Sequence, residues 1–180
     1  LCNTQGATEK EKYYFKMVSQ NKVDGIICVS YSDIESCVSE HVPIISLDRH
    51  FEKRISCISS DNYHGGEIAA EKMISTGSSK LLYIVSGSKI PGETMKREYG
   101  FRDYCKKRNI PCDIFYLGDE IDLFEKREAV IGDNIKEFLT ENMQDGKLRY
   151  DGVYASTDWL ALIVLKNMRK LGILVPDDTQ

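Results

Sequence analysis

Short runs of apolar, mostly β-branched residues alternate along the chain with stretches whose apolar positions recur at helical spacing. This alternation is typical of βαβ units built around a parallel sheet. The apolar runs predict strands near residues 23–29, 43–47, 57–59, 81–86, 113–117 and 152–155. Because these runs are continuously apolar, we expect both faces of the predicted sheets to be covered. The pattern therefore predicts an α/β fold with parallel sheets.

Stretches of helical spacing separate the predicted strands, near residues 9–21, 32–41, 62–76, 94–108, 124–142 and 158–171. In the second stretch, one helical face carries Ile34, Cys37, Val38 and His41. Glycine readily adopts the left-handed conformation that ends a helix. On this basis we interpret three glycines as helix ends: Gly77, Gly146 and Gly172.

The chain is long enough for one large α/β domain or for two small lobes, since its 180 residues are 42% hydrophobic. A seam lies near residues 59–61, where a predicted strand ends and an Asp-Asn pair opens a helix. We interpret this seam as a crossover between two lobes. The formal net charge of -4 comes without a basic stripe, so this segment is not expected to contact nucleic acid.

Six cysteines occur without a CxxC pair, and Cys28, Cys57 and Cys112 fall within apolar runs. This usage predicts buried, reduced thiols and a cytoplasmic protein. No run of about 18 apolar residues could span a bilayer, and no membrane partner is expected. The chain starts at Leu1 within a predicted strand, so we expect a preceding segment, either a DNA-binding module or a signal peptide.

Neither catalytic nor metal chemistry is indicated. The three histidines form no HExxH motif, so no metal is expected. The GxSxG, GxxxxGK[ST] and GxGxxG motifs are absent. Residues 86–89 are interpreted as a polar loop, and the SxxK pattern at residues 19–22 as a coincidence because its companion motifs are missing. The residues therefore favour binding without catalytic residues or a cofactor.

Three groups of segments, taken together, resemble the lactose-repressor (LacI/GalR) family. The first group is VDGIICVS with VPIISLDR, at residues 23–30 and 42–49. The second is DNYHGGEIAA at residues 61–70, followed by LYIVSG and the RxxGF signature at residues 97–101. The third is DGVYASTDWLA with LGILVPDD, at residues 151–161 and 171–178. The order and spacing of these segments across nearly the whole chain carry the resemblance.

The resemblance implies two Rossmann-like lobes, as in periplasmic binding proteins, incomplete at both ends in this chain. Residues 1–60 would form part of the lobe nearer the DNA, and residues 61–180 most of the distal lobe. The family's helix-turn-helix is absent, and a small molecule is expected in the cleft between the lobes. The physics of open parallel sheets agrees, because such sheets bind ligands beyond the carboxyl ends of their strands.

Arg97 is the first candidate ligand residue, because the arginine of the family's RxxGF signature points into the cleft. Its planar fork suits a diol or a carboxylate, and such a bond contributes about 1.5–3 kcal/mol. The alternative is a surface pair with Glu93 at i, i+4. Thr157 and Asp158 follow, at a turn where family members carry an Asn-Asp or similar pair. Their alternative role is to cap a helix.

The resemblance also places Asp48 and Arg49 at a strand end facing the cleft, with Ser30 at the end of the preceding strand. Leu123 or Phe124 matches the position where the family stacks an apolar or aromatic side chain on the ligand. Core packing is the equal alternative for that pair. Trp159 is assigned to the core.

The function implied is effector-controlled repression, in which a sugar or sugar derivative closes the lobes of a homodimer and alters operator DNA binding. Two rivals stay open. A periplasmic sugar-binding protein shares the architecture but needs an export signal, which the full-length gene would reveal. A nucleoside- or sugar-processing enzyme needs a nucleophile or base in the cleft, which an assay for turnover would reveal.

Overall fold

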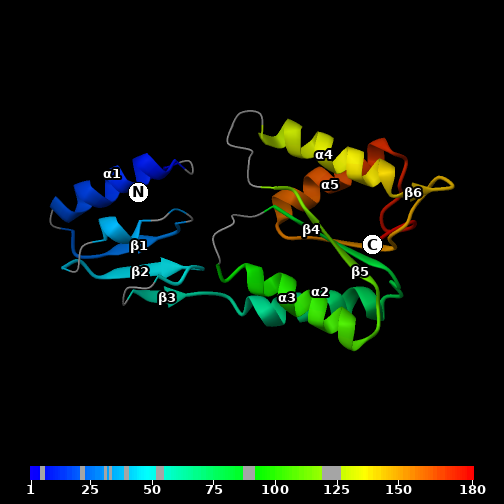
Figure 1. Cartoon of the computed structure of the whole chain (residues 1–180), viewed down its shortest axis with the longest axis horizontal. Helices are drawn as coiled ribbons and strands as arrows, with labels where there is room; N and C mark the ends of the chain where they lie inside the picture. Colours follow the sequence, from blue (N-terminus) through cyan, green and yellow to red (C-terminus); the bar gives the residue numbers. More distant parts are fainter. Residues whose placement is uncertain are drawn as a thin grey trace. The chain divides into compact units, whose positions relative to one another are not determined.

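The structure is a computed structural model of the chain and describes residues 1–4, 7–20, 23–30, 32, 34–38, 41–51, 55–86, 92–118 and 127–180. The chain divides into two compact units (Figure 1). The first comprises Leu1–Asn62 with Ile90–Met95, and the second comprises Tyr63–Lys89 with Lys96–Gln180. Both units contain parallel strands and helices, so the predicted α/β class is confirmed.

The first unit is a parallel sheet of order β1-β2-β3 with helix α1 along one side (Figure 1). Its elements are α1 (Thr8–Gln20), β1 (Ile26–Cys28), the 3-10 helix η1 (Glu35–Cys37), β2 (Ile44–Leu47) and β3 (Ser56–Ile58). Its buried core consists of Phe15, Ile34, Ile44 and Phe51. Because Phe15 lies on α1 and Ile44 on β2, this core joins the helix to the sheet.

One face of this first sheet is not covered by the described residues. Ile27 and Ile45 are partners across β1 and β2, and they alternate with the buried Ile44. Ile27 is 74% exposed and Ile58 is 60% exposed, and Val29 is exposed as well. Successive side chains of a strand point to opposite faces, so these residues define the open face. The expectation that both faces are covered is wrong for this unit.

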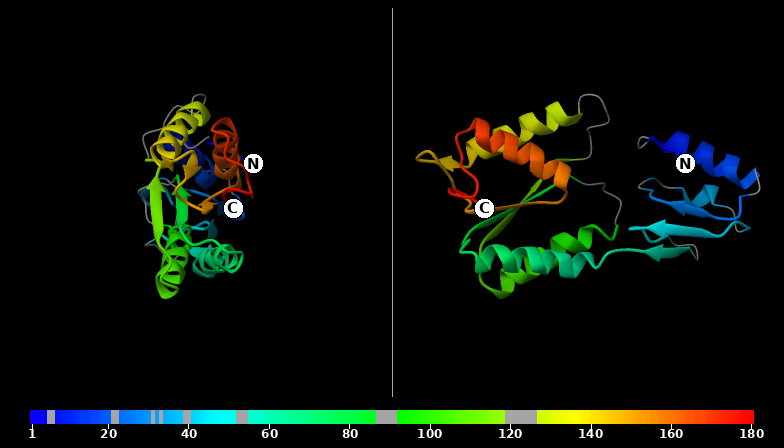
Figure 2. Two further views of the ribbon diagram at one scale, coloured as in Figure 1. Left: turned by 90° about the vertical axis from the view of Figure 1, so that its right-hand side faces the viewer. Right: turned by 180° about the vertical axis from the view of Figure 1, so that it is seen from behind.

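The second unit contains a parallel sheet of order β5-β4-β8 and four helices. Its elements in chain order are α2 (Asn62–Ser75), β4 (Leu81–Val85), α3 (Met95–Lys107), β5 (Cys112–Tyr116), α4 (Arg127–Glu141), β6 (Met143–Gln144), β7 (Lys147–Leu148), β8 (Gly152–Ala155) and α5 (Asp158–Lys170). Figure 2 shows α2 and α3 on one side of the sheet and α4 and α5 on the other.

The central strand β4 is buried on both faces, as its apolar run predicts. Leu81 and Tyr83 pack in the cluster beneath α2 and α3, together with Phe101. Leu82 and Ile84 pack in the other cluster, beneath α4 and α5. The expectation of two covered faces is therefore confirmed for this strand.

The predicted helix over residues 32–41 is wrong. Among the described residues of that stretch, only η1 is helical, and His41 lies exposed in a turn. Ile34 is nevertheless buried in the core and Cys37 and Val38 pack against it. The apolar spacing thus correctly identified residues that face the core. It did not require an α-helix, because one turn of 3-10 helix is enough to place them there.

The interpretation of Gly146 as a helix end is also wrong. Helix α4 ends at Glu141, and Gly146 lies in the turn of the antiparallel β6–β7 hairpin. Asp145 and Gly146 both have positive φ, 51° and 77°, as a two-residue Asp-Gly hairpin turn requires. Gly77 and Gly172 also have positive φ, and each is the second residue after the end of its helix, α2 and α5, so their prediction is confirmed.

The longest described helix, α4, has 15 residues, and none of the described helices has the length and apolar character needed to cross a membrane.

Candidate functional site

Arg97 lies in the first turn of α3, and the tertiary structure fixes its position closely. One terminal nitrogen of its guanidinium donates a hydrogen bond of 2.7 Å to the carbonyl oxygen of Ser156, directly after β8. A Cβ atom added to Gly66 of α2 would lie only 2.0 Å from the backbone carbonyl oxygen of Arg97. Helices α2 and α3 can approach this closely because Gly66 lacks a side chain. The arginine is therefore held at the carboxyl end of the second sheet.

Three stacked aromatic rings lie beneath α3. The ring centroids of Tyr83, Phe101 and Tyr154 are 5.1–5.5 Å apart. Tyr83 and Tyr154 are register partners on β4 and β8, which explains why their rings meet. Burial is the main cause that raises the pKa of both phenols, and the nearby charge of Arg97 opposes the shift. Both phenols therefore stay protonated at neutral pH and remain potential hydrogen-bond donors.

Sequence reasoning did not select these two tyrosines. The only signal was their place in two apolar strand runs, where an aromatic residue is ordinarily assigned to the core. The pairing of β4 with β8, which joins segments about 70 residues apart, was needed to bring them together.

Thr157 has the capping role that the sequence offered as an alternative. It is the N-cap of α5, and its Oγ1 accepts a hydrogen bond of 3.2 Å from the backbone N–H of Leu160. Asp158 is exposed in the first helical turn, where its negative charge complements the helix dipole. Ser156 is buried, and its Oγ has no hydrogen-bond partner among the described residues. A ligand contact by Thr157 or Asp158 stays a prediction.

The assignment of Trp159 to the core is wrong, because its side chain is 39% exposed. In helix α5 the buried positions include Leu160, Ile163 and Val164, and Trp159 precedes this face. The hydrophobic character of tryptophan suggested burial, but Trp159 lies at the margin of the buried face of α5 and stays partly exposed.

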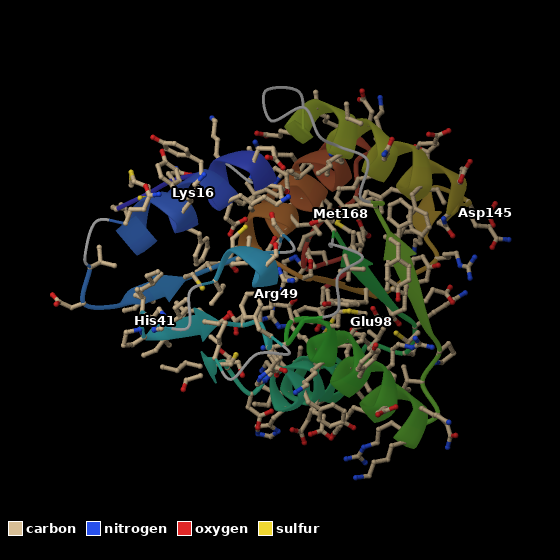
Figure 3. All side chains as sticks on the ribbon, turned by 60° about the vertical axis from the view of Figure 1, so that its left-hand side comes forward. Lys16, His41, Arg49, Glu98, Asp145 and Met168 are labelled. Atoms are coloured by element: carbon tan, nitrogen blue, oxygen red, sulfur yellow. The ribbon has the colours of Figure 1, made fainter. Side chains whose placement is uncertain are left out.

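In the first unit, Arg49 joins the ends of two strands. Its guanidinium donates to the carbonyl oxygens of Ser30 and Ser32 and lies 4.7 Å from the centre of the Phe51 ring. Its own carbonyl oxygen accepts a 2.6 Å hydrogen bond from Ser46 Oγ. With 7% exposure, Arg49 has an evident structural role in this unit (Figure 3). Its predicted contact with ligand is an additional role that stays a prediction.

Ser30 and Asp48 accompany Arg49 at these strand ends, as predicted from their positions after β1 and β2. Ser30 Oγ bonds to the backbone N–H and carbonyl of Ser32. Asp48 adopts a positive φ of 57°, and its Oδ1 is buried without a hydrogen-bond partner among the described residues. A residue other than glycine rarely adopts this conformation, although aspartate tolerates it better than most.

Gly92–Met95 belongs to the first unit although it lies between β4 and α3 in sequence, which sequence reasoning did not predict. The backbone N–H of Glu93 donates to Asp48 O at 3.2 Å, and Glu93 Oε1 lies 3.1 Å from His50 Nε2. Glu93 is buried, whereas His50 is 64% exposed. The segment is thus held at the strand end that carries Asp48.

Leu123 and Phe124, predicted to stack on a ligand, lie outside the described residues, which omit 119–126. Within the described ranges, no cluster of three or more histidine, cysteine, aspartate and glutamate side chains is arranged to hold a metal ion.

The chain matches two family descriptions. Residues 1–122 match the periplasmic binding proteins and sugar-binding domain of the LacI family, and residues 70–180 match a periplasmic binding protein-like domain. The sucrose operon repressors of Pediococcus pentosaceus and Streptococcus mutans are 31% and 28% identical over 98% and 99% of the chain. The alignments cover 51% of each repressor, so the chain spans about half the length of these curated relatives.

Among solved structures, the chain resembles a periplasmic binding protein/LacI transcriptional regulator from Alkaliphilus metalliredigens QYMF, crystallised with D-xylulofuranose. The TM-score is 0.76 at 26% identity, covering 100% of this chain and 63% of that one.

Proposed function

The chain belongs to the LacI family of periplasmic-binding-protein-like regulators, and from that premise we propose that it is the effector-sensing part of a bacterial transcriptional repressor. The effector is a sugar or sugar derivative. It alters the binding of operator DNA by a helix-turn-helix that is not in this chain, in a cytoplasmic homodimer. The two curated relatives named above are operon repressors, which favours this function over a transport-associated periplasmic binding protein and over an enzyme.

The observation that supports effector binding most strongly is the placement of Arg97. The hydrogen bond to Ser156 O and the close packing of α2 on α3 hold a guanidinium at the carboxyl end of the β8 strand. Ligands of open parallel sheets bind at that end of the strands. A cation fixed at this end of the strands suits a polyhydroxylated or anionic small molecule.

Regulation follows if the effector binds two conformations of the repressor with different affinity, because a ligand with equal affinity for both shifts no equilibrium. We retain residues 1–60 as part of the DNA-proximal lobe and 61–180 as most of the distal lobe. We also retain a set of predicted ligand contacts: Arg97, Thr157, Asp158, Asp48, Arg49, Ser30, Leu123 and Phe124.

The test is a titration of the full-length protein with candidate effectors, followed by calorimetry. The names of related proteins suggest sucrose, ribose and xylulose, each with and without a phosphate group. We expect at least one of them to bind and to change the affinity for operator DNA. Turnover of a bound sugar, or binding without any effect on operator affinity, would contradict the proposal.

Arg97→Ala is the decisive variant for the site. We expect a loss of about 1.5–3 kcal/mol in effector binding, because a charge-assisted hydrogen bond to the ligand is removed. Arg108→Ala is the matched control, because it removes the same kind of side chain directly after the other end of α3. There the Arg108 guanidinium lies 5.3 Å from the ring centre of Tyr104. Equal affinities for the two variants would remove Arg97 from the site.

A further inference from the structure

Two cysteines lie close together at the far end of α3 from Arg97. Cys105 is in the last turn of α3, and Cys112 is the first residue of β5. The turn between them is short, and the backbone N–H of Ile110 donates to Cys105 O at 2.9 Å. Both side chains belong to the same packed cluster, in which Cys105 is buried and Cys112 is half-buried. The fold therefore brings two thiols into one packed cluster although no CxxC motif joins them.

A cavity of about 440 Å³ gives small solutes a route to this pair. Cys105 and Cys112 both line it, and its charged lining consists of the cationic Arg102 and Lys106 and the anionic Asp103, which leaves an excess of positive charge. Positive charge beside a thiol stabilises the thiolate, which is the reactive form of cysteine. The cavity thus combines access, positive charge and two sulfur atoms.

The two thiols have different acidities because each is the other's neighbour. The neighbouring side chain of Cys112 lowers the pKa of Cys105, and burial opposes this effect. The neighbouring Cys105, followed by burial, raises the pKa of Cys112, whose thiol donates to the carbonyl oxygen of Asp113 at 3.8 Å. Cys105 is thus the sulfur that becomes a thiolate, and Cys112 is the neighbour that retains its proton.

We propose that Cys105 and Cys112 form a site of oxidative modification, in which a hydroperoxide converts the two thiols to an intramolecular disulfide. The Cys105 thiolate attacks one peroxide oxygen, the O–O bond breaks, and Cys105 becomes a sulfenic acid while hydroxide leaves and takes a proton to form water. The Cys112 sulfur then attacks the Cys105 sulfur and the S–O bond breaks. The departing hydroxyl group takes the Cys112 proton and forms a second water. Two thiols and one hydrogen peroxide give one disulfide and two waters.

The first unit provides an internal control. Cys28 and Cys57 lie on either side of Ser46 in register across β1, β2 and β3. Strand spacing places their backbones roughly 9–10 Å apart, which is too far for a disulfide. Burial, the largest cause, raises the pKa of Cys28. This pair has the same residue types, but only Cys28 packs in the core cluster of its unit, whereas Cys105 and Cys112 share one cluster.

The experiment is a peptide map of the reduced protein after a brief treatment with hydrogen peroxide and capping of free thiols with N-ethylmaleimide. Trypsin cleaves at Lys106, Lys107 and Arg108, so a disulfide appears as two linked peptides that dithiothreitol separates. We expect the peptide of Cys105 joined to that of Cys112, while Cys28 and Cys57 carry the cap. Cys105 should react about tenfold faster than Cys28, because the pKa of Cys105 is lowered and that of Cys28 is raised, so that more of Cys105 is thiolate.

Two variants test the direction of the chemistry. In Cys112→Ser, Cys105 should stop at the sulfenic acid, which dimedone traps. In Cys105→Ser, Cys112 should give no dimedone adduct. Disulfides distributed evenly among all the cysteines, or an equal yield of adduct from the two variants, would overturn the proposal. The wild-type map decides the question by itself if Cys105→Ser fails to fold, and a failure of effector binding leaves this inference unaffected.

Discussion

The two sheets of this protein are built from similar apolar runs but are buried differently. In the second unit, β4 contributes side chains to two buried clusters, one beneath α2 and α3 and the other beneath α4 and α5. In the first unit, the core lies on one face, and Ile27 and Ile58 on the other face are 74% and 60% exposed. Continuous apolar strands are typical of sheets covered on both faces. An apolar run therefore indicates that a strand can be buried on both faces, and not that both faces are covered.

The largest expected contrast compares one isoleucine in each sheet. Ile84→Ala removes a fully buried side chain from β4 and should lower the free energy of unfolding by about 2–5 kcal/mol. Ile27→Ala in β1 should change it by less than about 0.5 kcal/mol, because this side chain is already largely in water. Chemical denaturation of both variants measures the contrast. A similar loss in the two variants would show that the open face is covered in solution.

The second contrast concerns neighbouring glycines on α2. A Cβ at Gly66 would lie 2.0 Å from the Arg97 carbonyl oxygen, whereas one at Gly65 would meet nothing within 4 Å. Gly66→Ala should therefore destabilise the second unit by about 1–3 kcal/mol or more, since backbone of α3 has to move. Gly65→Ala should stabilise it by about 0.5–1 kcal/mol, because alanine favours helix. Thermal unfolding distinguishes the two, and the same sign for both would refute the close α2–α3 contact.

The third prediction concerns pH and the second unit. The Asp151 carboxylate accepts hydrogen bonds from the backbone N–H groups of Ser79 and Lys80 and from Ser79 Oγ. Burial raises the pKa of Asp151, but these hydrogen bonds outweigh it and the net pKa is lowered. A carboxyl group whose folded pKa lies below its unfolded value contributes stability above the unfolded pKa, about 3.9, and loses it as pH falls further.

Asp151→Asn should therefore cost about 1–2 kcal/mol at neutral pH, because a charge-assisted acceptor becomes a neutral amide. It should also flatten the decline of stability between about pH 5 and pH 3. Denaturation curves across this range provide the measurement. Asp145→Asn is the control, since Asp145 lies at the exposed tip of the β6–β7 hairpin (Figure 3). An unchanged pH profile in Asp151→Asn would contradict the assigned role.

The smallest expected effect belongs to the cap of α5. Thr157→Ala should lower the free energy of unfolding by about 1 kcal/mol, because the backbone N–H of Leu160 loses its acceptor. Thr157→Ser should restore most of this loss, since serine also caps. Effector titration of the serine variant then separates the two roles of this residue. Unchanged affinity in both variants would leave Thr157 as a cap alone.

Much of the fold was predictable because local rules and burial agree in the second unit. The apolar run at β4 and the helix-ending positions of Gly77 and Gly172 were identified from sequence. The prediction of a helix over residues 32–41 was wrong, because a single turn of 3-10 helix places the apolar residues of that stretch against the core. At Gly146, an Asp-Gly pair was taken for a helix exit, although it is a strong signal for a hairpin.

The candidate site was predictable in a similar, partial way. The RxxGF signature identified Arg97, but its partner, the carbonyl oxygen of Ser156, carries no sequence signal because every residue has such an oxygen. Arg49 was selected as a ligand contact, and the structure shows it bonded to two backbone carbonyls of its own unit. Side-chain identity indicates which bonds a residue can make, and the neighbours in space determine which bonds it makes.

The α/β class, the position of most strands and helices, and the family of the chain could be read from the order of its residues, because periodicity and motif spacing are properties of the sequence. Which distant residues meet depends on the folded chain. It stacked Tyr83 on Tyr154, brought Cys105 beside Cys112 and kept Cys28 apart from Cys57. Strand order and helix approach set these distances, and both depend on the packing of side chains from segments far apart in the chain.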